Sequence, residues 1–436
     1  MNHHAGRDRY ARSNALLARA EKVIPLGSQT FSKSWTQYPK GHAPLFLTHG
    51  RGGRVWDVDG NEYVDLVGGL LPIVLGYCDP DVDAAIRTQL ERGISFSLAT
   101  ELEVELAELL VELIPSAEMV RFGKNGSDAT SACVRIARAV TGRDRIAAGG
   151  YHGWQDWYIG ATARHKGVPG AVRALTHRFP FLDLDALEGL FERHPGEFAG
   201  VIVETVGAVE PPAGHLEALR DLTHAHGALL IFDEIITGFR VHLGGAQARY
   251  GVTPDLSAFG KSMGNGMPIS AVLGRADLMA EMEHIFFSST FGGETLSLAA
   301  ALATVKKMRD CGVIDDLWNK GAVLAEGLRQ RIKNHGLVDV ISVAGVPAWT
   351  LLGFNQTSKG DSKEAVKTLL LRELLSRGVL TTGSHNVCYA HQPDDVAHVL
   401  GAYDHALAVV ADAVRRGNIE AQLDCPVIRP VFAVRS

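Results

Sequence analysis

Residues 228–240 read ALLIFDEIITGFR, a short apolar run followed directly by two acids. Residues 255–262 read DLSAFGKS, a shorter apolar run followed by a lysine. Runs of this kind are typical of buried parallel strands. The carboxyl ends of neighbouring parallel strands meet at the edge where α/β folds bind ligands. We therefore expect Asp233 and Lys261 to lie near each other at one edge of such a sheet.

The sequence around these two runs alternates between strand and helix patterns. Between Arg121 and Gly274 the order is strand, helix, strand, loop, strand, helix, strand, loop, strand. This alternation predicts an α/β fold with a mostly parallel central sheet and helices on both faces. We expect three parts: an N-terminal segment (1–55), a large domain (56–310) and a smaller α+β domain (311–436) with which the N-terminal segment packs.

Outside the central stretch, the chain shows further helix and strand patterns. A helical spacing of apolar residues covers 8–24, and the strand–turn–strand pattern at 53–65 predicts a hairpin. The remaining helices are predicted at 80–93, 101–114, 297–310, 313–335, 362–377 and 394–415, with a short sheet region at 338–353.

Composition excludes several classes of protein. The chain has 436 residues, 46% of them hydrophobic, and a net charge of −6 with no basic block, so we expect neither nucleic acid nor an anionic membrane as a partner. The five cysteines are scattered and odd in number, which is unlike a disulfide framework or a zinc site. The first residues, MNHHAGRD, lack the apolar core of a signal peptide, and no segment reaches about 20 apolar residues, so we expect neither a signal peptide nor a spanning helix. We expect a cytoplasmic protein.

Common cofactor and metal motifs are missing. Gly260-Lys261-Ser262 resembles the end of a nucleotide-binding P-loop, but Asp255 stands where that motif needs a glycine. No dinucleotide fingerprint opens a helix after an early strand, and no Gly-x-Ser-x-Gly elbow is found. The eighteen histidines show no metal-ligand spacing, so no metal is predicted.

Residues 119–129, MVRFGKNGSDA, predict a strand, a glycine turn and the start of a helix. Free N–H groups at the helix N-terminus, the Ser127 hydroxyl and close approach at Gly126 would suit a phosphate group. The Ser-Asp pair is also an ordinary helix cap, so this pattern alone leaves both interpretations open.

The pieces together fit pyridoxal 5'-phosphate (PLP). This cofactor needs a lysine for a Schiff base, an acid at its ring nitrogen, phosphate donors and flat or apolar groups on the two ring faces. Lys261, Asp233 and Gly126 with Ser127 supply the first three. Tyr151 and Ile235 supply the ring faces. A simple ion pair between Lys261 and Asp233 is the alternative for that pair taken alone.

The chain resembles the class III aminotransferases of PLP fold type I over nearly its whole length. The motifs that carry the resemblance are VWDVDG at 55–60, NGSDA at 125–129, YHG at 151–153, LIFDEI at 230–235, FGK at 259–261 and STFGG at 289–293. The resemblance implies a large PLP-binding domain and a homodimer in which Thr290 reaches the phosphate in the neighbouring subunit. It also implies that His152 and Glu204 belong to the cofactor site.

Within that family the chain is most similar to the glutamate-1-semialdehyde aminomutase branch, and it departs from it in the substrate-binding segments. Lys33 stands where that branch has a carboxylate-binding arginine, and Arg and Lys are not interchangeable in a bidentate clamp. Leu70 replaces an aromatic residue, and Glu294 replaces the asparagine of a Gly-Asn-Pro sequence. These departures are similar to those of offshoots that aminate sugars in polysaccharide or aminoglycoside biosynthesis.

The sequence therefore predicts an aminotransferase that works by a ping-pong mechanism. L-Glutamate is the expected donor, and an aldehyde or ketone, sugar-derived carbonyls included, is the expected acceptor. Lys33 and Arg240 are candidates for the donor carboxylate, and Trp154 and Glu294 for a sugar. An aminomutase, a PLP-dependent racemase or epimerase, and a PLP-binding subunit without turnover are the alternatives. The paired Lys261 and Asp233 argue against the last.

Overall fold

The computed structural model describes residues 9–429, which form two compact units. The first joins the residues up to Asp79 with those from Asp315 onward, and the second runs from Pro80 to Ile314. Residues 56–79, expected in the large domain, fall in the first unit. The physical reason is strand pairing, because β3 (Glu62–Asp65) pairs with β13 (Val379–Leu380). Residues 1–8 and 430–436 of the predicted domains lie outside the described residues.

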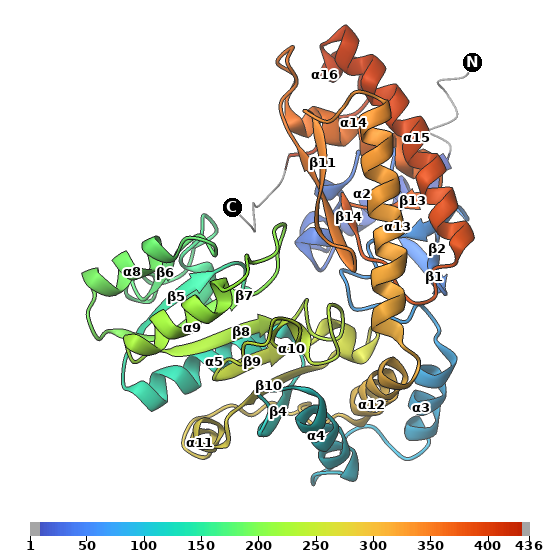
Figure 1. Ribbon diagram of the computed structural model, residues 1–436. Helices are drawn as coiled ribbons and strands as arrows, with labels where there is room; N and C mark the ends of the chain where they lie inside the picture. Colours follow the sequence, from blue (N-terminus) through green and yellow to red (C-terminus); the bar gives the residue numbers. More distant parts are fainter. Residues whose placement is uncertain (1–8, 430–436) are drawn as a thin grey trace. The chain divides into compact units, whose positions relative to one another are not determined.

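The second unit is built on a seven-stranded sheet (Figure 1). In chain order its strands are β4 Met119–Gly123, β5 Arg145–Gly149, β6 Thr176–Arg178, β7 Phe198–Glu204, β8 Leu229–Glu234, β9 Leu256–Phe259 and β10 Ser270–Gly274. Their order across the sheet is β4-β10-β9-β8-β7-β5-β6. Only β10 runs against its neighbours, so the prediction of a mostly parallel sheet is confirmed.

Helices cover both faces of this sheet. The helices of this unit are α3 Pro80–Leu90, α4 Glu101–Leu113, α5 Gly126–Thr141, α6 Asp156–Ile159, α7 Gly170–Arg173, α8 Leu184–Arg193, α9 His215–Ala225, α10 Gly245–Tyr250, α11 Ala276–Met279 and α12 Thr295–Asp310. One apolar core packs α5 against the sheet, and a separate core packs α8 and α9. Neighbouring residues of β8 alternate between these cores, which places α5 on one face and α8 with α9 on the other.

The first unit contains two smaller sheets. One has the order β1-β2-β3-β13, with β1 Leu47–Arg51 and β2 Arg54–Asp57, and the other joins β11 Ile341–Val346, β12 Trp349–Phe354 and β14 Ser384–His385. Its helices are α2 Ala11–Ala20, α13 Val313–Asn334 (which begins at the boundary between the units), α14 Lys363–Ser376, α15 Pro393–Arg416 and α16 Ile419–Gln422. Among residues 9–429, no helix combines the length and the apolar character that a membrane crossing requires.

Candidate active site

The two strands from which the prediction started are neighbours in the sheet. β8 and β9 run parallel, with Asp233 opposite Ala258 and Glu234 opposite Phe259. Lys261 follows the end of β9 by two residues. Asp233 and Lys261 therefore lie at the same carboxyl edge, which is the edge where open α/β sheets bind ligands.

The two acids at the end of β8 point to opposite faces because side chains alternate along a strand. Ile231 belongs to the core on the α5 side, and Asp233 shares its face. Phe232 belongs to the other core, and Glu234 follows on that side of the sheet. A period of two therefore gives the adjacent acids different surroundings.

Asp233 is held by two donors in a nearly closed environment. Its side chain is 5% exposed. One carboxylate oxygen accepts a hydrogen bond from His152 Nδ1 at 2.8 Å, and the other accepts one from the backbone N–H of Ile235 at 3.1 Å. These two contacts fix the orientation of the carboxylate.

His152 is buried among aromatic side chains. Its ring lies nearly parallel to Trp157, with 6.2 Å between centroids, and meets Tyr158 edge-on at 5.2 Å. Nδ1 donates to Asp233, and Nε2 is the ring nitrogen that remains. It is buried and has no hydrogen-bond partner among residues 9–429. A buried polar atom without a partner is uncommon and marks a position that deserves a functional explanation.

Glu234 has a structural function. Its carboxylate accepts hydrogen bonds from the Thr237 hydroxyl and from the backbone N–H groups of Ala246 (2.8 Å) and Gln247 (2.9 Å), at the start of α10. Burial raises the pKa of Glu234 above its ordinary value, and these hydrogen bonds offset part of that shift. Gly245 allows the close approach, since a Cβ there would lie 2.7 Å from the Glu234 carboxyl carbon.

Lys261 opens a short 3-10 turn, Lys261–Gly264, and has a left-handed backbone with φ of 36°. Non-glycine residues in this region store about 1–3 kcal/mol of strain, and such residues cluster at functional sites. A Cβ on Gly260 would lie 3.1 Å from Ile235, and one on Gly126 would lie at the same distance from Ile235. The ends of β8 and β9 and the start of α5 therefore meet around one isoleucine.

The start of α5 forms the predicted cradle. Asn125 is the N-cap of the helix, and its backbone N–H donates a hydrogen bond to the Asp128 carboxylate at 2.8 Å. The loop that follows β5 lies against Ser127, whose hydroxyl accepts a hydrogen bond from the Trp154 backbone at 3.3 Å. A Cβ on Gly153 would lie 2.2 Å from the same hydroxyl oxygen. Backbone N–H groups at such a helix start bind phosphate groups in many proteins.

Tyr151 and Glu204, which the sequence assigned to the cofactor site, are in contact. The Glu204 carboxylate accepts a hydrogen bond from the Tyr151 backbone N–H at 2.9 Å. The Tyr151 ring meets Tyr158 edge-on, with 5.6 Å between centroids. In the structure Glu204 fixes the loop that carries Tyr151 and His152.

The predicted substrate residues have contrasting surroundings. Trp154 is 65% exposed, whereas Arg240 is fully buried. Thr290 is exposed, and Lys33, in a 3-10 turn of the first unit, is also exposed. Glu294 is occupied: it caps α12 and pairs with Lys124, a contact that the sequence reasoning missed. The two charges directly adjoin the motifs at 125–129 and 289–293, and this position is the one signal in the sequence that pointed to the pair.

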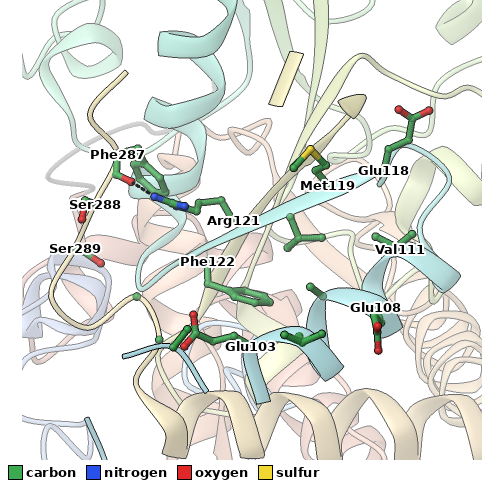
Figure 2. Close-up of a pocket in the computed structure, with 16 residues that line it drawn as sticks. Glu103, Glu108, Val111, Glu118, Met119, Arg121, Phe122, Phe287, Ser288 and Ser289 are labelled. Atoms are coloured by element: carbon green, nitrogen blue, oxygen red, sulfur yellow. Dashed lines mark hydrogen bonds between the residues drawn. The ribbon is translucent and has the colours of Figure 1, made fainter. Parts of the chain in front are cut away.

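A cavity of about 830 Å3 lies elsewhere in the second unit, between α4, β4 and residues 287–293 (Figure 2). Figure 2 shows Arg121 reaching the backbone oxygen of Phe287, with Glu103 and Glu108 on α4. None of the predicted catalytic or cofactor residues lines this cavity.

Comparison with known proteins identifies the family. The model of the class III aminotransferases matches residues 37–397. A 3-aminobutyryl-CoA aminotransferase of Cloacimonas acidaminovorans is 36% identical, over 92% of this chain and 97% of the relative. A glutamate-1-semialdehyde 2,1-aminomutase of Natranaerobius thermophilus is 35% identical, over 92% and 99%. The chain belongs to the class III aminotransferase family.

Solved structures agree with this assignment. FumI of Sphingopyxis sp. MTA144, solved with PLP, has a TM-score of 0.85 and 31% identity, covering 92% of this chain and 96% of FumI. An omega-transaminase of Sphaerobacter thermophilus has a TM-score of 0.82 and 30% identity, covering 92% and 97%. The chain has the PLP-dependent transferase fold type I, as its sequence predicted. Class III aminotransferases are enzymes that use PLP.

Proposed function

We propose that this chain is a PLP-dependent aminotransferase that transfers an amino group from L-glutamate to an aldehyde or ketone. One observation carries the proposal. Asp233 and Lys261 end neighbouring parallel strands, and Gly126 at the start of α5 packs against the same Ile235 as Gly260. An acid, an amine and an anion-binding helix start are the three groups that PLP requires of a protein.

The residues fit the cofactor by their chemistry. The unpartnered His152 Nε2, the cradle at Gly126 and Ser127 and the strained Lys261 are features that a fold built for stability alone would not need. When bound, PLP supplies an electron sink for the electron pair released at the substrate carbon. Asp233 would bind the protonated ring nitrogen, and the cradle would bind the phosphate. Tyr151 and Ile235 would pack against the ring.

Lys261 would have two functions. Its Nζ would hold the cofactor between turnovers, and after displacement by the donor amine it would move the proton at the substrate carbon. Asp233 must stay ionised for this to work. Its two hydrogen-bond donors fix the position of the carboxylate. His152 would position the carboxylate, and Glu204 would position the loop that carries His152.

The donor carboxylate requires a cation. Lys33 is the better of the two candidates, because Arg240 is fully buried and would need its surroundings to move.

The hypothesis of a sugar-derived acceptor now rests on fewer residues. Glu294 has its carboxylate engaged by α12 and Lys124, so it is a poor ligand for hydroxyl groups. The exposed Trp154 remains available to pack against a substrate ring.

An aminomutase is the second candidate. Two glutamate-1-semialdehyde aminomutases, at 35% and 37% identity, stand beside the aminotransferase among the relatives. Such an enzyme would turn over one substrate without a separate donor. A racemase or epimerase would need neither a donor nor an acceptor. A binding subunit without turnover is disfavoured, because binding alone would not need a proton-transferring lysine beside Asp233.

We further propose that the chain is a cytoplasmic homodimer and that a second copy covers the face around α4. That face exposes large apolar side chains, among them Val104 (57%), Val111 (41%) and Met119 (47%), around the cavity of Figure 2. Exposed apolar patches of this kind mark interaction sites. Thr290, in the adjoining segment, would then serve the partner's phosphate. Analytical ultracentrifugation of Val104→Glu tests this, since a variant as dimeric as the wild type contradicts it.

The function is tested by the absorption spectrum of the protein reconstituted with PLP, before and after L-glutamate alone. We expect a visible band that collapses towards the near ultraviolet, and its recovery on adding a carbonyl acceptor from a panel that includes oxidised sugars and amino-acid semialdehydes. A band untouched by glutamate, together with turnover of a single substrate, favours the aminomutase. Absence of any band after adding PLP refutes the proposal.

A further inference from the structure

Lys124 and Glu294 form an ion pair that is largely closed to solvent. Lys124 Nζ lies 3.0 Å from a carboxylate oxygen of Glu294, and the two side chains are 15% and 12% exposed. The pair joins the turn before α5 to the residue that caps α12, two points far apart in the sequence. Pairs at such low exposure are screened far less by water and salt than surface pairs are.

The Glu294 end of this pair is firmly fixed. Its carboxylate caps α12 by accepting hydrogen bonds from the backbone N–H groups of Leu296 (2.7 Å) and Ser297 (3.2 Å). The next residue, Thr295, donates from its backbone to the Ile94 carbonyl at 2.9 Å. Burial raises the pKa of Glu294, but hydrogen bonds from Ser297 and Lys124 outweigh it and bring the pKa below its ordinary value. The carboxylate is therefore charged at neutral pH.

The Lys124 end adjoins the anion-binding turn. Lys124 directly precedes Asn125, the cap of α5, and its backbone N–H lies 3.3 Å from the Asp128 carboxylate. Asn125 and Asp128 already form a complete capping box, so α5 does not need Lys124 in order to start at Gly126. The ion pair therefore adds a constraint on where the turn lies, with Glu294 and α12 as its anchor.

We propose that the Lys124–Glu294 pair is a positioning device that holds the first turn of α5 against the capped end of α12, so that the N–H groups at Gly126 and Ser127 are preorganised for the cofactor phosphate. The inference rests on the proposed function. Without the pair, the turn would have to be ordered when PLP binds, and that cost would appear as lost affinity. Lys124 acts through the turn and does not itself bind the phosphate, because Glu294 holds its ammonium group.

The test measures PLP dissociation constants of the apoprotein by quenching of tryptophan fluorescence, with Lys124→Met as the variant. Lys307→Met is the matched control: Lys307 lies on α12, is also 15% exposed and pairs with Asp81 at 2.6 Å, on α3. We expect Lys124→Met to weaken PLP binding about tenfold and the control to change it less than about twofold. Asp81 is 64% exposed, so water screens the control pair and Lys307→Met should lose less thermal stability than Lys124→Met.

Glu294→Gln and the double variant separate positioning from direct binding. A positioning pair predicts that Glu294→Gln also weakens PLP binding and that the double variant is little worse than either single variant. If Glu294→Gln tightens binding instead, Lys124 is a direct phosphate ligand and the inference is wrong. Equal dissociation constants for Lys124→Met and Lys307→Met also overturn it. A wild-type protein that binds no PLP would instead refute the proposed function itself.

Discussion

Replacing His152 by phenylalanine tests whether the reaction depends on the hydrogen bond that holds the Asp233 carboxylate. The substitution keeps a flat ring beside Trp157 and Tyr158 but removes the donor that lies 2.8 Å from Asp233. A hydrogen bond to a charged group contributes about 1.5–3 kcal/mol. If that contribution is lost where the reaction needs an ionised, fixed carboxylate, the rate falls by about 10- to 150-fold.

Stability should respond differently from activity. Phenylalanine also removes the buried, unpartnered Nε2, and a buried polar atom of this kind costs about 1–3 kcal/mol. Removing Nε2 raises the free energy of unfolding, and losing the hydrogen bond to Asp233 lowers it by a similar amount. We therefore expect the melting temperature of His152→Phe to stay within about 4 °C of the wild type.

The assay is the single-turnover rate with L-glutamate, followed by the loss of the visible band. His152→Asn keeps an N–H group near the position of Nδ1, so it should retain most of the rate that the phenylalanine variant loses. His224→Asn is a control, because His224, on α9, forms an equally short 2.8 Å pair with Asp255, which directly precedes β9. A His152→Phe enzyme within twofold of the wild-type rate would refute the reasoning.

Four further results are expected. Lys261→Ala should keep the far-ultraviolet circular dichroism of the fold and lose at least about a thousandfold in turnover, as expected when a covalent base is removed; measurable turnover at a tenth of the wild-type rate contradicts this. Gly153→Ala places a Cβ 2.2 Å from the Ser127 hydroxyl oxygen on a backbone with φ of 103°, so calorimetry should show about 2 kcal/mol less stability, and PLP binding should weaken. Burial raises the pKa of Glu234, so protonation of Glu234 stabilises the fold at low pH, and this contribution is lost as the pH rises through the folded-state pKa. Urea unfolding of Glu234→Gln should therefore show a smaller decline in the free energy of unfolding over this pH range than the wild type does. Lys33→Ala should raise KM for L-glutamate about tenfold with little change in kcat, and an unchanged KM would assign the donor carboxylate to another cation.

Much of the fold could be predicted because its strands are short apolar runs that end in polar residues. The predicted helices at 101–114, 362–377 and 394–415 agree with the structure to within about two residues. The strand β6, Thr176–Arg178, was missed because three consecutive polar residues carry no detectable period. The strand β10 was not predicted either, and its reversed direction could not have been, since an apolar run has the same pattern in a parallel and an antiparallel strand.

The candidate site was predictable where a residue type is chemically distinctive, as with Lys261 and Asp233. The sequence could not say how Glu204 and Glu294 use their carboxylates. Each accepts backbone hydrogen bonds whose donors come from another segment or from a helix start, and such contacts depend on tertiary packing. The alternation along β8 could have separated Glu234 from Asp233 in advance, because a period of two puts adjacent side chains on opposite faces.

The reversed strand β10 has a consequence for the order in which the protein is assembled. β4 is an edge strand whose one neighbour in the sheet is β10, and Met119 pairs with Gly274. During synthesis the ribosome therefore exposes β4 long before its partner exists, and unpaired strand edges are prone to aggregate. The turn before α5 follows β4 directly, so the phosphate cradle would be among the last parts of the second unit to reach its final place. A nascent chain arrested before residue 270 should contain the parallel strands but lack an ordered phosphate cradle. We expect it to depend on chaperones more strongly than the full-length chain does.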